Sequence, residues 1–285
     1  MNKDLEELYL EINTKYIENN VKFPKIKRLI HMNKWNIVFT DNFSVGIAFN
    51  FTGEHNIYNQ DIDLKQIKKL NKFIDKNIKL FIEYLLDYSD IQSRSFLVAS
   101  LNALSQNIMD KEYMNKKDFK LLETDEFDFL GKEDTVTLIG YGGVVDKIRG
   151  KCKIFNVVDK RLDILIKPLV IEDKVRYEPN DINFYNDIDE DNILDKTDVL
   201  IITASTLVNG TYKDIIKKSK NCRIKGIFGP SGQMLPEILF NLGFNYITSN
   251  KINNTDKYYK DIINPMNNLI KYKDYSEKYS IIKIK

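Results

Sequence analysis

The sequence predicts a two-part α/β protein, with an α+β domain over residues 1–130 and a parallel-sheet domain over residues 131–285. Three observations support this division. The first part has extended segments followed by a block of helical patterns, and the second has short apolar strands that alternate with helical patterns. Between them, residues 110–134 are dense in charge. At 285 residues the chain is long enough for two medium-sized cores.

The first part opens with an amphipathic helix, because its apolar residues recur at helical spacing. These residues are Leu5, Leu8, Ile12 and Tyr16. Extended segments follow at 25–32, 35–40 and 43–50. Asp41 and Asn42 tolerate the left-handed conformation, so they predict a two-residue hairpin between the last two segments.

Three helical patterns come next, at 64–74, 78–88 and 93–109. In the third, Ala99 and Ala103 lie four residues apart, so they form a smooth face that would allow another helix to approach closely. Strands followed by helices are typical of an α+β domain.

The second part contains five short, largely apolar strands, at 135–140, 153–159, 198–203, 223–229 and 244–249. Helical patterns at 212–220 and 235–243 lie between the later strands, and Gly243 is placed to end the second helix. Continuously apolar strands that alternate with helices indicate a parallel sheet covered on both faces, in a Rossmann-like arrangement.

Composition excludes several classes of partner. The formal net charge is +2 with 29% charged residues, so no strong field for nucleic acid or a membrane surface is expected. Cys152 and Cys222 form no disulfide framework, residues 1–20 do not resemble a signal peptide, and no apolar window is long enough for a membrane helix. We expect a cytoplasmic protein. For the tail, 271–285, an edge strand and a contact within a homo-oligomer both stay open.

Polar loops directly follow three strands of the second part. Their residues include Gly140, Tyr141, Gly143, Thr203, Ser205, Thr206, Asn209, Thr211, Gly229, Pro230 and Ser231. Because the carboxyl ends of parallel strands meet at one edge of a sheet, the three loops should converge there and bind a small molecule.

Other interpretations of these residues stay open. The glycine pattern after Gly140 lacks the last glycine of the dinucleotide fingerprint. Asp159 nevertheless ends the second strand, where a ribose-binding acid would lie, so an S-adenosyl or nucleotide cofactor is the alternative. Thr211 and Asp214 also have the spacing of a capping box, and Ser231 can cap a helix. His31 and His55 have no partner at metal-ligand spacing.

Two segments resemble the heavy-metal-chelation family. "TASTLVNGTYKDII", followed about twenty residues later by "GPSGQMLPEILFNLGFNYITS", is similar to that family's Rossmann-like domain, and "LIGYGG" is similar to its first strand and turn. "FSVGIAFNF" and "FLVASLNALSQ" resemble its N-terminal domain, whose fold is similar to the N-terminal domain of enolases. The resemblance covers about residues 5–265.

The resemblance implies a ligand cleft between the two domains. By position, it assigns the cleft the residues Asn102, Gly140, Tyr141, Thr203, Thr206, Asn209, Thr211, Gly229, Pro230 and Ser231. Two departures leave the shape of the loops open. Ala204 stands where members often have glycine, and Gly232–Gln233 replace the usual continuation after Gly-Pro-Ser.

The leading hypothesis is therefore a protein that binds, and in one version modifies, a small polar or anionic molecule in the interdomain cleft. A metal chelator or its precursor fits the family. With two histidines and two scattered cysteines, a soft-metal site of protein ligands is not expected, so a divalent metal would take oxygen ligands or an organic chelator. The rival hypotheses are a nucleoside-cofactor enzyme and a purely structural or partner-binding protein.

Overall fold

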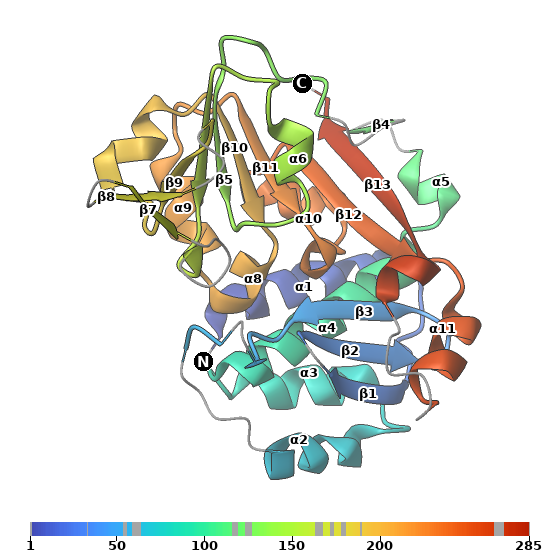
Figure 1. The fold of residues 1–285 in the computed structure, drawn as a ribbon. Coiled ribbons are helices and arrows are strands. Elements are labelled where there is room, and N and C mark those ends of the chain that lie inside the picture. Colours follow the sequence, from blue (N-terminus) through green and yellow to red (C-terminus); the bar gives the residue numbers. More distant parts are fainter. Residues whose placement is uncertain are drawn as a thin grey trace.

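The computed structural model describes residues 2–32, 34–53, 56–58, 64–115, 119–122, 127–162, 168–171, 174–177, 181–188, 190–264 and 271–284. His55 lies outside these ranges. The fold is mixed α/β, with a small antiparallel sheet and a large sheet that is mostly parallel (Figure 1).

The first half pairs a three-stranded sheet with helices. The strands are β1 (Ile26–Met32), β2 (Trp35–Thr40) and β3 (Val45–Phe49), antiparallel and in that spatial order. The helices are α1 (Lys3–Glu18), α2 (Leu64–Leu70), η2 (Asn71–Phe73), α3 (Ile78–Leu86) and α4 (Ile91–Ile108). The predicted strands and helices of this half are confirmed. The helix predicted over 64–74 is the exception in length, because α2 ends at Leu70 and the 3-10 helix η2 ends at Phe73.

The predicted two-residue hairpin is wrong, because four residues separate β2 from β3. Phe43, with φ of 66°, takes the left-handed conformation that was expected of Asp41 and Asn42. The Asn42 side chain explains the difference, since its Oδ1 accepts hydrogen bonds from the hydroxyls of Thr40 and Ser44 at 2.6 and 2.8 Å. Those bonds fix a wider turn.

The second half is built on an eight-stranded sheet in the order β4-β13-β12-β11-β10-β5-β6-β9. The run from β12 to β9 is parallel, whereas β13 and β4 are antiparallel. The strands are β4 (Phe119–Leu122), β5 (Thr135–Ile139), β6 (Ile154–Val158), β9 (Asn183–Tyr185), β10 (Val199–Thr203), β11 (Ile224–Phe228), β12 (Tyr246–Ile252) and β13 (Ser276–Lys283). The five predicted strands are β5, β6, β10, β11 and β12.

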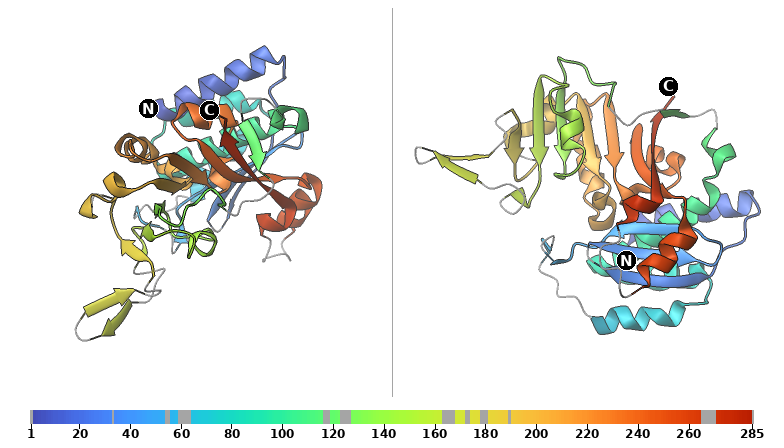
Figure 2. Two further views of the ribbon diagram at one scale, coloured as in Figure 1. Left: turned by 90° about the horizontal axis from the view of Figure 1, so that it is seen from above. Right: turned by 45° about the vertical axis from the view of Figure 1, so that its right-hand side comes forward.

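Short helices connect these strands. They are α5 (Lys111–Met114), α6 (Val145–Ile148), η3 (Glu190–Lys196), α8 (Ser205–Asn209), α9 (Tyr212–Lys218), η4 (Pro230–Gly232), α10 (Pro236–Asn241), α11 (Thr255–Ile262) and η5 (Tyr272–Tyr275). A separate hairpin of β7 (Pro168–Ile171) and β8 (Lys174–Tyr177) projects from the body beside β9 (Figure 2). As predicted, Gly243 follows α10 with φ of 100°.

The tail forms a strand inside the sheet rather than at its edge. β13 pairs with β12 on one side and with β4 on the other. The sequence pattern did not indicate β4, a four-residue strand in the charged stretch between the halves.

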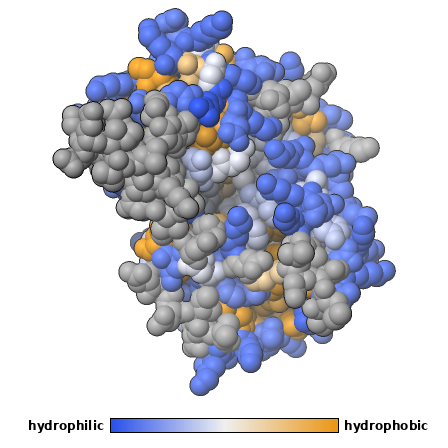
Figure 3. All heavy atoms as spheres, in the orientation of Figure 1, coloured by the Kyte–Doolittle hydropathy of each residue, from blue (hydrophilic) through white to orange (hydrophobic). Residues whose placement is uncertain are grey.

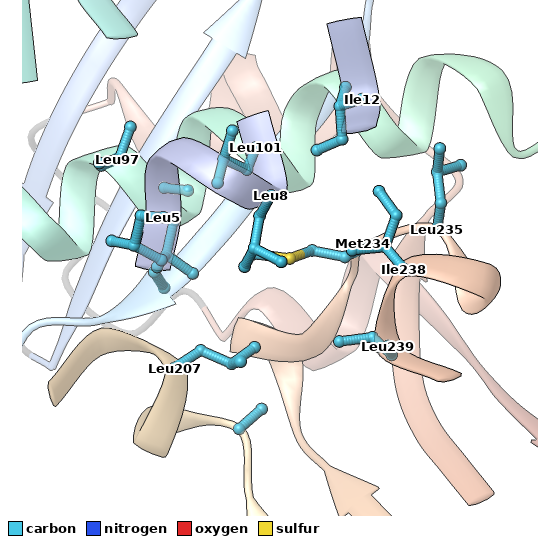
Figure 4. Packing of buried hydrophobic residues seen from close by; sticks show 14 of the residues in the cluster. Leu5, Leu8, Ile12, Leu97, Leu101, Leu207, Met234, Leu235, Ile238 and Leu239 are labelled. Atoms are coloured by element: carbon cyan, nitrogen blue, oxygen red, sulfur yellow. The ribbon is translucent and has the colours of Figure 1, made fainter. Parts of the chain in front are cut away.

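The two halves share one apolar core. Leu5, Leu8 and Ile12 of α1 belong to the same buried cluster as Leu207 of α8 and Met234 (Figure 4). On the other side of the small sheet, α11 and η5 of the second half pack against the outward-facing residues of β2 and β3. Contacts between the halves therefore cover both faces of the N-terminal sheet region.

None of the helices in the described part of the chain is both long and apolar enough to cross a membrane.

Candidate functional site

The loops after β5, β10 and β11 lie side by side, because these three strands are parallel neighbours. Gly140 ends β5 with φ of 95°, and a Cβ at this position would lie 2.6 Å from the Thr203 methyl at the end of β10. No other residue type fits this contact, since both the backbone angle and the space require glycine. The first two loops therefore touch.

Beyond Gly140 the edge of the sheet is open. A Cβ at Gly143 or Gly229 would meet no atom within 4 Å, while one at Gly142 would reach the Phe228 ring at 3.7 Å. Within the described residues, the backbone N–H groups of Gly142 and Gly143 have no hydrogen-bond acceptor. Backbone N–H groups in such an open glycine turn can donate hydrogen bonds to an oxygen-rich ligand.

Asp159, at the end of β6, has a fully occupied carboxylate. Its Oδ1 accepts hydrogen bonds from the backbone N–H and Nε of Arg161 at 2.9 and 2.8 Å. Its Oδ2 accepts from the backbone N–H of Tyr141 at 2.8 Å and from Nη2 of Arg161 at 2.5 Å. A carboxylate offers about four lone-pair positions, so this one has none left for a ribose hydroxyl. Asp159 holds the Tyr141 turn in place.

The segment after β10 turns helical sooner than expected, since α8 begins at Ser205. The Thr206 hydroxyl, in a residue only 3% exposed, donates to the Thr203 carbonyl at 2.7 Å. Thr203 and Ser205 are half-buried, with their hydroxyl oxygens 3.2 Å apart. Thr203 and Ser205 remain available at the sheet edge, whereas Thr206 closes the first turn of α8.

Asn209 and Thr211 lie at the far end of α8. The backbone N–H and the hydroxyl of Thr211 both donate to Asn209 Oδ1, at 3.1 and 2.8 Å. The expected capping box is wrong, because the Thr211 side chain caps no N–H of α9. Arg94 of α4 instead binds this end of α8 by donating to the carbonyls of Val208 and Leu207.

Asn102, Pro230 and Ser231 are buried between the two halves. The backbone N–H of Phe49 donates to Ser231 Oγ at 2.9 Å, and Asn102 Nδ2 donates to the carbonyls of Ile47 and Ser231 at 2.9 and 3.0 Å. The Pro230 carbonyl lies 3.4 Å from the same nitrogen. The hydrogen bonds of Asn102 and Ser231 join the two halves, and all three residues are buried, so their placement in an open ligand cleft stays a prediction that this burial does not favour.

Sequence reasoning missed three polar residues of this interface: Arg94, Gln106 and Gln233. Gln106 Nε2 donates to the Gln233 carbonyl at 2.9 Å, and Gln233 Oε1 accepts the backbone N–H of Ile47 at 3.1 Å. Their positions within otherwise apolar segments could have indicated them. A polar side chain that is buried with apolar neighbours needs a hydrogen-bond partner, so it is a candidate for a contact between elements.

The predicted site residues therefore separate into three groups. Those at the open edge of the sheet are Gly140, Tyr141, Gly143, Asp159, Thr203, Ser205 and Gly229. Those buried in the interface or in α8 are Asn102, Thr206, Pro230 and Ser231, and those at the far end of α8 are Asn209 and Thr211. Figure 3 shows weakly polar residues in a recess across the middle of this face, between strongly hydrophilic margins. Ligand binding by the first group stays a prediction.

The described residues do not supply a soft-metal site. They contain no group of three or more His, Cys, Asp or Glu side chains placed to hold a metal ion. Burial raises the pKa of the Cys152 thiol to about 11 and that of the Cys222 thiol to about 11, so both thiols stay protonated near neutral pH. His31 Nδ1 lies 2.6 Å from Asn36 Oδ1.

Comparisons with known proteins agree on one family. A family model described as "Putative heavy-metal chelation" matches residues 125–280, and a second model with the same description matches residues 15–105. An uncharacterized protein of Methanocaldococcus jannaschii is 29% identical over 193 residues, which is 67% of this chain. The match spans 65% of that relative's length.

Two crystal structures of proteins with unknown function have similar folds. One, from Pyrococcus horikoshii, has a TM-score of 0.69 at 21% identity and covers 97% of this chain and 100% of that one. The other, from Desulfitobacterium hafniense, has a TM-score of 0.68 at 14% identity and covers 99% and 100%.

Proposed function

Because the chain belongs to the family described as "Putative heavy-metal chelation", we propose that it binds a metal chelator or a chelator precursor, a small polar or anionic molecule, at the open edge of the large sheet. In this proposal residues 1–130 are an enolase-N-terminal-like domain and residues 131–285 a Rossmann-like domain, and the ligand lies where the two meet. The two free cysteines suit a reducing compartment, so we assign the protein to the cytoplasm.

One observation carries the proposal: three glycine- and hydroxyl-bearing loops meet at the carboxyl ends of β5, β10 and β11. Gly140 and Thr203 are in contact, and Gly142 and Gly143 follow in the same loop, where their backbone N–H groups have no acceptor among the described residues. Open α/β sheets bind their ligands outside the carboxyl ends of the strands. The half-buried hydroxyls of Thr203 and Ser205 lie at the same edge, and a hydroxyl can both donate a hydrogen bond to a ligand and accept one from it.

The chemistry of these groups favours an oxygen-rich organic molecule over a bare metal ion. Backbone N–H groups and hydroxyls donate hydrogen bonds to carboxylate, phosphate or phenolate oxygens, whereas a soft cation needs thiolate or imidazole ligands. A metal would then arrive as a complex, with the organic chelator supplying its donor atoms. The role of the protein is to bind, and in one version to modify, that chelator.

The nucleoside-cofactor alternative receives less support. In that alternative the Asp159 carboxylate accepts hydrogen bonds from the ribose hydroxyls. In the structure, both of its oxygens already accept hydrogen bonds from Arg161 and from the backbone N–H of Tyr141. A ribose would have to displace the Arg161 ion pair, whose two side chains are 14% and 5% exposed.

A bulky side chain at Gly143 tests the proposal. Gly143 has an unstrained backbone and open space at Cβ, so Gly143→Phe should fold normally and fill the edge of the sheet. Native mass spectrometry of freshly purified wild-type protein should detect a bound organic molecule with or without metal, and Gly143→Phe should lose it.

The matched control is Gly131→Phe. Gly131 precedes β5 at the opposite edge of the sheet, and its Cβ position meets only the Asp134 side chain at ordinary contact distances. This variant should retain the ligand. Equal retention by both variants, with unchanged melting temperatures, would place the ligand elsewhere and remove the proposal.

A further inference from the structure

A separate groove lies between the C-terminal end of α4, the edge formed by β4 and β13, and the start of α11. It has a volume of about 960 Å³. These elements occupy the right-hand side of the molecule in Figure 1 and come forward in the right-hand view of Figure 2. The sheet-edge residues of the proposed site, such as Gly140 and Gly143, do not line it.

The groove has an apolar floor with one cation. Met109 and Ile252 are only 1% and 7% exposed, and Leu122 and Met114 are half-buried beside them. The cation is Lys251, also half-buried, whose Nζ donates to the Met109 carbonyl at the end of α4. An ammonium carries three N–H donors, and the described residues accept one of them through this bond.

The acidic residues of the groove lie at its rim. Asp110, Asp256 and Glu277 are exposed, as is the second lysine, Lys278. Charges in water are screened, whereas a half-buried charge acts through a lower dielectric. Among the charged residues that line the groove, Lys251 is the half-buried one, so its ammonium acts on a molecule at the floor with the least screening.

Burial lowers the pKa of Lys251, and the negative charge of Asp110 opposes that shift only in part. The charge of Asp110 therefore does not fully offset the loss of hydration that burial imposes on the Lys251 ammonium. An anion that displaced water from the floor would supply the missing charge.

We propose that this groove is a second binding site for a small apolar carboxylate, with the carboxylate on Lys251 Nζ and the hydrocarbon body against Met109, Met114 and Ile252. Its volume lies within the roughly 300–1,000 Å³ range of small-molecule sites. The site is independent of the sheet-edge ligand, so either proposal can fail alone.

Octanoate is the probe, measured by isothermal titration calorimetry against octanol and octylamine. We expect octanoate to bind the wild type more tightly than either uncharged or cationic analogue. Lys251→Met, which keeps the apolar length and removes the charge, should weaken octanoate binding about tenfold, as expected for the loss of a charge-assisted hydrogen bond.

Lys278→Met is the matched control, because Lys278 lines the same groove but is exposed at its rim. It should change octanoate affinity less than twofold, which is the size expected for a screened surface charge. Gly143→Phe should also bind octanoate normally, since it alters only the other site. Undetectable binding to the wild type, or equal binding by Lys251→Met, would overturn the proposal.

A measurement on the wild type avoids any effect of substitution on folding. Octanoate should slow acetylation of Lys251 by an activated ester, read by peptide mass spectrometry, and leave acetylation of Lys278 unchanged. Equal rates at Lys251 with and without octanoate would contradict the assigned position of the carboxylate.

Discussion

Arg94 shows how a single side chain joins the two halves. Its guanidinium forms an ion pair with Asp4 of α1 at 2.7 Å, and the two side chains are only 12% and 15% exposed. The same group donates to the carbonyls of Leu207 and Val208 at the end of α8. One residue of α4 therefore fixes both α1 and the helix that follows the Thr203 loop.

Removing either partner of this pair should be costly, because it leaves a buried charge without its counterpart. We expect Arg94→Met and Asp4→Leu each to lower the free energy of unfolding by about 3 kcal/mol, and the double variant to lose less than the sum. Urea unfolding of the four proteins measures this coupling. Additive losses would show that the pair contributes no interaction of its own.

The pair should also give a pH dependence. Burial raises the pKa of Asp4, but the hydrogen bond and charge of Arg94 outweigh it, so the pKa lies below its ordinary value of 3.8. The stabilisation is then present above pH 3.8 and is lost as pH falls through the folded-state pKa. Arg94→Met should lose this contribution, which acid unfolding curves can detect.

The sequence did not predict the hydrogen-bond partners of individual polar side chains. Thr206, Asn209 and Ser231 were expected to contact a ligand, yet their hydroxyl and amide oxygens bond to the chain itself. Thr206 and Asn209 bond to Thr203 and Thr211, and a motif does not show whether a polar side chain bonds to such a near neighbour or to a ligand. Ser231 bonds to Phe49, far away in the sequence, so its partner depends on which elements pack together.

The packing of β3 on α4 sets the geometry of the N-terminal half. A Cβ at Gly46 would overlap the Ala99 carbonyl oxygen and the Ala103 amide nitrogen. A close approach at Ala99 and Ala103 was predicted, but the expected partner was a helix, whereas the structure places strand β3 there through Gly46. The sequence could predict the helix face but not which strand lies on it.

Gly46→Ala should consequently force the strand away from the helix. Because the obstacle is backbone on both sides, we expect a loss of about 3 kcal/mol or more, at the upper end of the cost of overpacking. Gly131→Ala, at an ordinary contact in an exposed loop, should change stability by less than about 0.5 kcal/mol. Thermal unfolding of both variants checks this, and equal melting temperatures would contradict it.

Element boundaries were predicted best where apolar runs were continuous. β5, β6, β10, β11 and β12 coincide with such runs, since strands buried on both faces need them. The position of β13 inside the sheet and the early start of α8 were not predictable in the same way. The position of β13 depends on long-range pairing with β12 and β4, whereas the first turn of α8 depends on a local bond, from the Thr206 hydroxyl to the Thr203 carbonyl.

On the scale of the whole molecule, the two halves are joined by a common interior. Leu8 of α1 and Met234 of the second half are 1% and 0% exposed within one cluster. The large sheet already includes β4 (Phe119–Leu122), and the division at residue 130 stays a prediction as a boundary between folding units. A core that continues across the boundary favours cooperative unfolding.

We therefore expect a single thermal transition for the whole chain. Leu8→Ala should remove about 3 kcal/mol through the cavity it leaves, and should lower the one transition without splitting it. Scanning calorimetry measures both effects. Two separated transitions, with only the first displaced by the substitution, would show that the halves unfold independently.

The position of β13 between β12 and β4 has a consequence for protein synthesis. β4 ends at Leu122 and its sheet neighbour β13 begins at Ser276, 154 residues further along the chain. At roughly 5–20 residues per second, the ribosome needs on the order of 10 s to make that interval. β4 therefore cannot complete its pairing until the last part of the chain has been made, and its backbone N–H and C=O groups wait for β13 during that interval.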